Sequence, residues 1–194
     1  MTTQTPPRPS PTALPTPQIP TLLASDSELY PSPLTLATLT GWIAAAPSHS
    51  LDYAGAGVAV ALPLALAPWR ALVAGDLKEW ELTPAMFVAP GARPGGVHVW
   101  HVERYPGWRR EWGPFADAVR RDLRLDEGAG RWSALCVTPD GRNMCERRWN
   151  GRERAYSGQV VVDGALRERA EWEAAGAHGA LQGWAVMIVG GDDQ

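Results

Sequence analysis

The sequence lacks the residues on which several classes of small protein depend. Two cysteines among 194 residues are too few for a disulfide framework or a four-cysteine zinc site. No basic segment followed by an apolar one opens the chain, so no signal peptide is visible. The apolar stretch over residues 54–69 contains two prolines and is too short to span a membrane. We therefore expect a cytoplasmic protein that makes no membrane contact.

Lysine and phenylalanine are also scarce. Lys78 is the single lysine beside 17 arginines, and two phenylalanines stand against ten tryptophans. An arginine excess with many Ala, Gly and Pro residues also fits coding by a GC-rich genome. Apolar residues make up 45% of the chain, which is enough for a packed core and excludes disorder throughout.

Proline is concentrated near the N-terminus, where residues 1–33 hold nine of the 18 prolines. Few apolar residues there can offset the entropy lost on ordering, so we expect residues 1–24 to form a disordered tail. A passive extension is favoured over a linker or docking segment. Residues 25–190 are expected to form a single α+β domain, and residues 191–194 a loose acidic end.

Apolar spacing predicts the main elements. Phe115, Val119 and Leu123 recur every four residues and indicate a helix with one apolar face. Helices are predicted over residues 33–45, 63–75 and 113–125, and strands over residues 51–62, 84–89, 96–104 and 183–189. The fold class is therefore α+β: a largely antiparallel sheet with a C-terminal hairpin meander, and two or three helices packed on one face.

The meander is predicted from turn residues. Asn-Gly and Asp-Gly tolerate the positive φ angles that two-residue hairpins require. Such dipeptides occur at residues 140–141, 150–151 and 163–164. The resulting register places Cys136 opposite Cys145 and Trp132 opposite Trp149. The cysteines would be close enough for a redox pair, but two reduced thiols are the favoured interpretation. No metal site and no cofactor site are predicted.

Positive charge gathers in one third of the chain. Residues 104–154 contain 12 arginines and eight acidic residues, whereas both flanking segments are acidic. Guanidinium groups pair with phosphates and aromatic rings stack on bases, so this pattern favours single-stranded DNA or RNA as a partner. The predicted nucleic-acid-binding residues are Arg147, Trp149, Arg152, Arg154, Tyr156 and Trp132, with Arg109, Arg110, Arg120 and Arg121 extending the surface.

Catalysis is harder to predict from this sequence, because no motif in it specifies a reaction. His98 and His101 lie three apart in a predicted strand, so they should face opposite sides and share no metal. His101 and Glu103 should face the same way, as an acid/base pair or a surface hydrogen bond. We therefore expect no catalytic residues and a non-enzymatic accessory protein that binds nucleic acid. The alternative is a protein–protein interaction module or a subunit of a larger, ribonucleoprotein-type complex.

Overall fold

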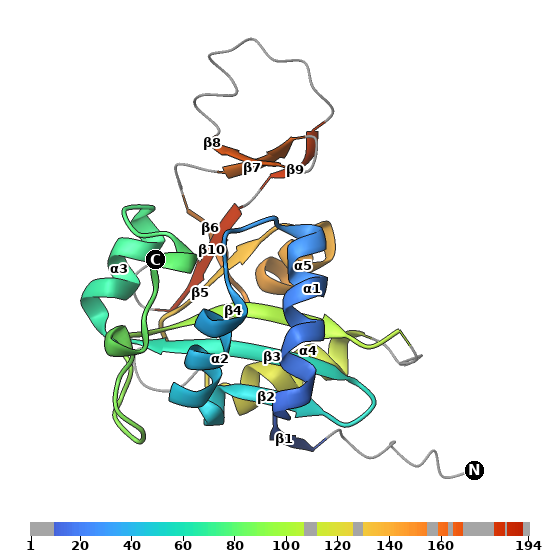
Figure 1. Ribbon diagram of the computed structural model, residues 1–194, viewed down its shortest axis with the longest axis vertical. Coiled ribbons are helices and arrows are strands. Elements are labelled where there is room, and N and C mark those ends of the chain that lie inside the picture. The colour runs from blue at the N-terminus through green and yellow to red at the C-terminus, as the bar shows by residue number, and fades with distance from the viewer. Residues whose placement is uncertain are drawn as a thin grey trace.

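The computed structural model describes residues 10–106, 112–125, 130–154, 159–162, 165–168, 181–184 and 186–191 (Figure 1). The predicted α+β class is confirmed. Seven strands form a mixed sheet in the order β1-β2-β3-β4-β5-β10-β6, and a separate sheet has the order β8-β7-β9. The strands of the large sheet are β1 (Pro11–Ala13), β2 (Ser50–Tyr53), β3 (Gly57–Leu64), β4 (Gly96–Arg104), β5 (Trp132–Cys136), β6 (Arg152–Glu153) and β10 (Val186–Gly190). Those of the small sheet are β7 (Gln159–Val162), β8 (Ala165–Glu168) and β9 (Leu181–Trp184).

Helices cover both faces of the large sheet, whereas the sequence predicted them on one face. The α-helices are α1 (Ile19–Leu29), α2 (Leu36–Ala45), α3 (Leu66–Ala74), α4 (Trp112–Asp122) and α5 (Pro139–Asn143). Short 3₁₀ turns occupy Thr16–Gln18, Pro47–His49, Glu79–Glu81 and Pro84–Met86, and a π-helical turn occupies Met144–Arg148. In Figure 1, α1 and α2 lie in front of the sheet and α4 lies behind it. None of the described helices is long and apolar enough to cross a membrane.

Two apolar cores result, one on each face of the sheet. The central strand β3 is buried along its whole length, as expected of a strand covered on both sides. Its Val60 and Leu62 pack with α1, α2 and α3, whereas Ala59 and Ala61 pack with α4. Gly57 allows Phe115 of α4 to pack directly on β3, because a Cβ atom at residue 57 would lie 2.7 Å from the Phe115 ring.

The predicted tail is wrong over the part that the structure describes. Strand β1 pairs antiparallel with β2, and helix α1 begins at Ile19. Leu14, Ile19 and Leu22 are buried in the core beneath these elements, so they supply the apolar contacts that proline content alone did not reveal. Residues 1–9 lie outside the described residues.

Other predicted elements need correction as well. The strand predicted over residues 51–62 is a hairpin, because Gly55 turns the chain with a φ of 72° between β2 and β3. The segment over residues 84–89 is a 3₁₀ turn at Pro84–Met86 followed by a single β-bridge between Phe87 and Leu64, rather than a strand. By contrast, β4 spans the predicted residues 96–104, and α2, α3 and α4 lie within about three residues of their predicted bounds.

The meander is wrong in its first part. The Thr138 hydroxyl accepts a hydrogen bond from the Gly141 amide, and Pro139 follows it, which starts helix α5 where a strand was predicted. The π-helical turn then continues to Arg148, and β6 pairs with β10. Farther along, β7 and β8 pair antiparallel with Val162 opposite Ala165, as the 163–164 turn predicts.

Strands β4 and β5 run parallel and place the candidate site. Their register covers three pairs, from Val97 with Trp132 to Val99 with Ala134. Strand β4 continues to Arg104 and β5 to Cys136, but within the described chain no pair joins them beyond Val99. The sheet is therefore split at the carboxyl ends of these two strands.

Candidate active site

A cavity of about 90 Å³ lies where β4 and β5 separate. We call it the cleft. Val99, Cys136 and Met144 belong to the core on the α4 face, whereas Trp100 and Leu135 pack with the core on the opposite face. Side chains from both cores line the same space because the sheet is open there. The polar or titratable side chains along the cleft are Asp26, Tyr30, Glu79, His101, Cys136, Thr138 and Cys145.

His101 is held between two carboxylates at this cleft. Its Nδ1 lies 3.2 Å from an Asp26 oxygen, and its Nε2 lies 3.3 Å from a Glu103 oxygen. The Ser25 hydroxyl donates to the same Glu103 oxygen at 2.9 Å. Because carboxylates only accept hydrogen bonds, both ring nitrogens donate when the imidazole is protonated. The sequence predicted that His101 and Glu103 face the same way, and the 3.3 Å contact confirms this.

The charge state of His101 follows from these contacts. Burial disfavours the charged ring, but the hydrogen bonds and negative charges of Asp26 and Glu103 outweigh it, so the net pKa of His101 is raised. Hydrogen bonding to His101 in turn lowers the pKa of Glu103, against the opposing effect of burial. The pair thus favours an imidazolium beside a carboxylate, which is a proton donor in a largely apolar cleft.

A β-bulge explains why the sequence misplaced His101. The register of β4 against β3 shifts between Val60 and Ala61, which face His101 and Val99, so Trp100 is an extra residue. A bulge reverses the alternation of side chains from that point onward. His98 and His101 therefore face the same side of the sheet, contrary to the prediction. Even so, no group of three His, Cys, Asp or Glu side chains within the described ranges could hold a metal ion.

His98 belongs to a buried network that clamps the paired part of β4 and β5. Its Nε2 lies 2.6 Å from a Glu79 oxygen, and its Nδ1 lies 2.9 Å from the Ser133 hydroxyl. The Trp69 indole donates to the same hydroxyl at 3.1 Å. The Ser133 hydroxyl therefore joins the Trp69 indole to the His98 ring, whose other nitrogen reaches Glu79. Burial raises the pKa of Glu79, and the bond to His98 offsets part of that rise.

The two cysteines meet, although not across a hairpin. Cys136 lies in β5 and Cys145 in the π-helical turn, and both are buried free thiols. A hydrogen bond with Cys136, together with burial, raises the pKa of the Cys145 thiol well above its usual value. Such a thiol is a poor nucleophile at neutral pH. The redox role stays a prediction.

The predicted aromatic platform is part of the core. Trp132 is 2% exposed and Trp149 is 1% exposed. Their rings meet edge to face with centroids 5.5 Å apart, and the Trp149 indole donates to the Ala116 carbonyl at 3.0 Å. The contact between these tryptophans is confirmed, but neither ring can stack on a base. Tyr156 lies outside the described residues.

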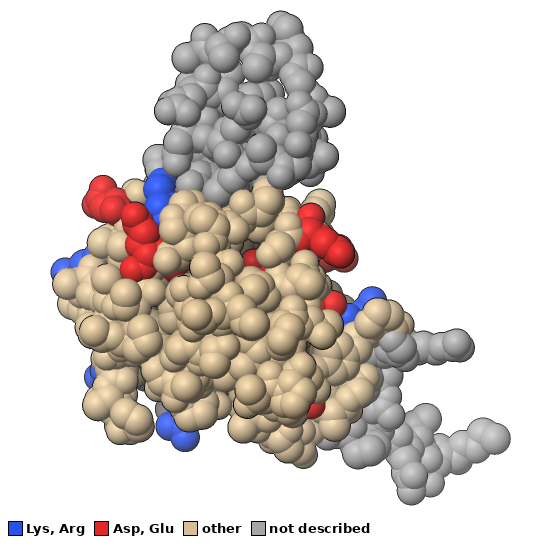
Figure 2. Space-filling model, in the orientation of Figure 1, with Lys and Arg blue, Asp and Glu red and all other residues tan. Residues whose placement is uncertain are grey.

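The predicted arginines that the structure describes come from α4, from the π-helical turn and from β6 with the residue after it. Arg147, Arg152 and Arg154 are exposed, but Arg120 donates to the Arg148 carbonyl and Arg121 pairs with Asp122. Arg109 and Arg110 lie outside the described residues. Figure 2 shows Lys and Arg side chains only at the edges of the face that α1 and α2 cover.

The similarity of this chain to known proteins lies in its fold and not in its sequence. No family model matches the sequence, and no curated protein matches it. A solved structure titled "GphF GNAT-like decarboxylase in complex with isobutyryl-CoA" resembles this chain with a TM-score of 0.52 and 15% sequence identity. The similarity covers 94% of this chain and 98% of that chain. The chain therefore has a GNAT-like fold.

This likeness corrects the predicted function. The matched protein is a decarboxylase, which is an enzyme. The predictions of a non-enzymatic nucleic-acid-binding protein, of an interaction module and of a complex subunit are wrong. The pair of His101 and Glu103, two residues apart on one strand, is the feature of the sequence that is compatible with acid/base chemistry.

Proposed function

We propose that this chain is an enzyme that binds an acyl thioester, such as an acyl-CoA, in the cleft and transfers a proton with His101. One observation carries the proposal: two parallel strands separate beside a buried imidazole that Asp26 and Glu103 hold. The complex of the fold neighbour with isobutyryl-CoA supports the choice of ligand. We keep the cytoplasmic location expected from the sequence as part of it.

The shape of the cleft suits the arm of a CoA thioester. That arm is long and thin and carries amide groups, so it needs a narrow slot with backbone partners. The facing edges of β4 beyond Val99 and of β5 beyond Ala134 lack a strand partner in the described register. Their amide and carbonyl groups can bind the arm as they would bind a neighbouring strand.

The first reaction that we propose is decarboxylation of a 2-carboxyacyl thioester. The bond between the α-carbon and the carboxylate breaks, CO₂ leaves, and the electron pair moves into an enolate that the thioester carbonyl stabilises. The His101 imidazolium then donates its proton to the α-carbon, which yields the saturated acyl thioester and a neutral ring. Asp26 and Glu103 favour the return of a proton to His101 from water.

Acyl transfer to an amine is the second candidate, and the charge of the cleft favours it. Asp26 and Glu79 line the cleft and Glu103 lies beside His101, whereas no Lys or Arg is among the described lining residues. An amine enters as a cation, so these carboxylates attract it. The bound ammonium must first lose one proton to water, because only the neutral amine has a lone pair for attack. Once His101 has also lost its proton, it can accept the second proton from the nitrogen as this attacks the thioester carbon, and the CoA thiolate then leaves.

One set of assays separates the two reactions. Malonyl-CoA and methylmalonyl-CoA are followed chromatographically for the decarboxylated acyl-CoA, and acetyl-CoA with a panel of polyamines and lysine peptides is followed for release of free thiol. His101→Asn should lower whichever activity the wild type shows by about 100-fold or more, whereas Arg70→Gln, at an exposed position on α3 that lines no described cavity, serves as the control. Absence of both activities, together with absence of CoA binding by calorimetry, would contradict the proposal.

A further inference from the structure

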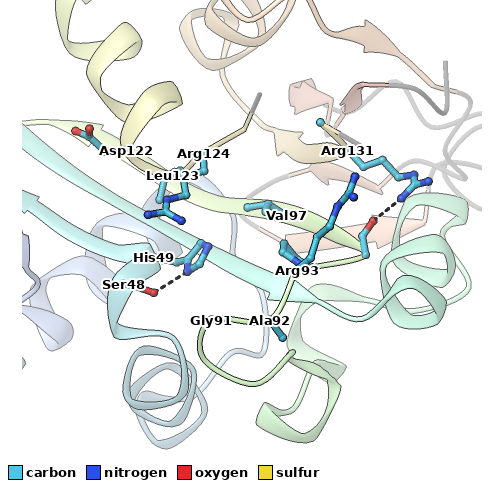
Figure 3. Close-up of a pocket in the computed structure, with 13 residues that line it drawn as sticks. Ser48, His49, Gly91, Ala92, Arg93, Val97, Asp122, Leu123, Arg124 and Arg131 are labelled. Carbon is cyan, nitrogen blue, oxygen red and sulfur yellow. Dashed lines mark hydrogen bonds between the residues drawn. The ribbon is translucent and has the colours of Figure 1, made fainter. Parts of the chain in front are cut away.

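A second hollow, of about 600 Å³, lies at the other end of the same two strands (Figure 3). We call it the basic hollow. Gly95 and Val97 line it from the amino end of β4, and Gly130 and Arg131 line it ahead of β5. It shares no lining residue with the cleft. Val97 of the hollow and Val99 of the cleft are the nearest lining residues on β4, two residues or about 7 Å apart along the strand.

Cationic side chains from three separate segments surround this hollow. Arg93 comes from the loop before β4, Arg124 follows helix α4, and Arg131 precedes β5. His49 adds an imidazole, with its Nδ1 3.1 Å from the Ser48 hydroxyl. The described lining includes one carboxylate, Asp122, which pairs with Arg121 at 2.9 Å. Figure 3 shows the Arg124 guanidinium beside the His49 ring, and the Arg93 guanidinium on the side of Arg131.

This concentration is unusual in a chain of net charge −3. Arg131 has one terminal nitrogen 3.3 Å from the Gly95 carbonyl, which ties it to the rim. Burial and the positive charge of Arg124 both lower the pKa of His49. A positive charge beside an imidazole disfavours protonation of the ring, which marks Arg124 and His49 as close neighbours in the hollow.

The backbone of Arg124 supplies an independent observation. Its φ is 56°, in the left-handed region that glycine adopts without strain. The Arg124 amide donates to the Arg121 carbonyl, and the Leu125 amide donates to the Arg120 carbonyl. This is the pattern of a helix C-terminus at which glycine is the usual residue. Helix α3 ends in this usual way, with Gly75 at a φ of 88°. An arginine at this position is a strained choice that favours a role for its side chain.

We propose that the basic hollow binds the phosphate group of a small molecule other than the acyl thioester. Guanidinium groups form paired hydrogen bonds with phosphate oxygens, and several of them match its multiple negative charge. The position at the amino ends of β4 and β5 separates this ligand from the split end where the thioester arm would lie. A phosphorylated metabolite could thus occupy the enzyme without entering the cleft.

The binding test uses inorganic phosphate and pyrophosphate with the full chain. Isothermal titration in a chloride buffer of constant ionic strength should show binding to the wild type, and binding at least tenfold weaker to Arg93→Gln and Arg124→Gly. Arg70→Gln, an exposed arginine on α3 outside the hollow, should bind as the wild type does. Absence of binding to the wild type, or equal loss in the Arg70→Gln control, would overturn the proposal.

A second titration, with CoA, distinguishes a separate ligand from the phosphates of the coenzyme itself. If the ligand is separate, the Arg93→Gln and Arg124→Gly variants keep the CoA affinity of the wild type. An equal loss of CoA and pyrophosphate affinity would assign the hollow to the coenzyme and overturn the proposal. Neither titration measures turnover. The result for phosphate binding can therefore be interpreted even if the chain lacks the proposed enzyme activity.

Discussion

The two ends of the β4–β5 pair have opposite chemistry. At the carboxyl end, Asp26, Glu79 and Glu103 lie in or beside a cavity of about 90 Å³, and the central imidazole is almost fully buried. At the amino end, Arg93, Arg124 and Arg131 line an open hollow of about 600 Å³. The narrow end restrains its histidine with two carboxylates, whereas the open end places a histidine beside an arginine.

The difference shows how one strand pair can serve two sites. Between the ends, three residue pairs hold β4 and β5 together, and the His98–Ser133 contact lies at the middle pair. Where pairing stops, side chains and backbone edges become available to a ligand. His101 has a raised pKa and His49 a lowered one, and in each case the neighbouring charges contribute to the direction. The two histidines are thus suited to different charge states at neutral pH.

Replacing His101 should give the largest difference between the two ends. His101→Asn removes the proton donor, so we expect the activity on the acyl thioester to fall by about 100- to 10,000-fold. Pyrophosphate binding at the basic hollow should stay unchanged. Steady-state kinetics and calorimetry on the same preparation measure the two effects, and His49→Asn provides the reverse comparison. Full activity in the His101 variant would remove this residue from the mechanism.

Breaking the buried network of His98, Ser133 and Trp69 between β4 and β5 should lower the stability of the protein. Ser133→Ala leaves the Trp69 indole and the His98 Nδ1 without their shared partner in a fully buried position. An unsatisfied buried polar group costs about 1–3 kcal/mol, so the free energy of unfolding should fall by about 2 kcal/mol. Denaturant unfolding followed by tryptophan fluorescence measures it, with Ser48→Ala at the exposed rim as control. A change below about 0.5 kcal/mol would show that the network does not hold the strands.

How far the sequence predicts this site depends on the range of the contacts. The contact of His101 with Glu103 follows from strand alternation, which is local, and it was predicted correctly. Asp26 reaches His101 across 75 positions, from a helix that the proline pattern concealed, so no local rule could find it. The bulge at Trp100 inserts one residue, which was enough to bring His98 and His101 onto the same face, contrary to the predicted alternation.

The fold shows the same contrast between local and tertiary signals. Strand β4 and helix α4 have strong periodicity and appear where the pattern predicts them. The segment after β5 carries an Asp-Gly turn signal, but the Thr138 cap and Pro139 start a helix instead. Trp132 and Trp149 still meet, because both side chains belong to one apolar core and the helical turn brings them together. Their burial, which decides against stacking on bases, depends on α4 packing over them.

Replacing one of the two carboxylates beside His101 should lower the pKa of the histidine without removing the hydrogen bond that it donates. Glu103→Gln removes the negative charge beside Nε2 but keeps an oxygen that can accept a hydrogen bond. The pKa of His101 should fall, and the pH dependence of activity should shift to lower pH. A histidine whose pKa is raised on folding stabilises the folded state below about pH 6.5, and this stabilisation is lost as the pH rises through the folded-state pKa. The variant should therefore also be less stable than the wild type at acidic pH. Histidine titration by NMR, with His49 as internal reference, measures the pKa.

The smallest effect that we predict is a change in stability at Arg124 that is opposite in direction to the change in pyrophosphate binding. Arg124→Gly relieves a left-handed backbone angle at the end of α4, so the free energy of unfolding should rise by about 1 kcal/mol while pyrophosphate binding falls. Gly75→Ala at the corresponding end of α3 is the matched reverse change and should destabilise by a similar amount. Thermal and denaturant unfolding measure both. If Arg124→Gly instead destabilises the chain, the arginine serves the fold itself, and the strain at φ 56° carries no information about a ligand.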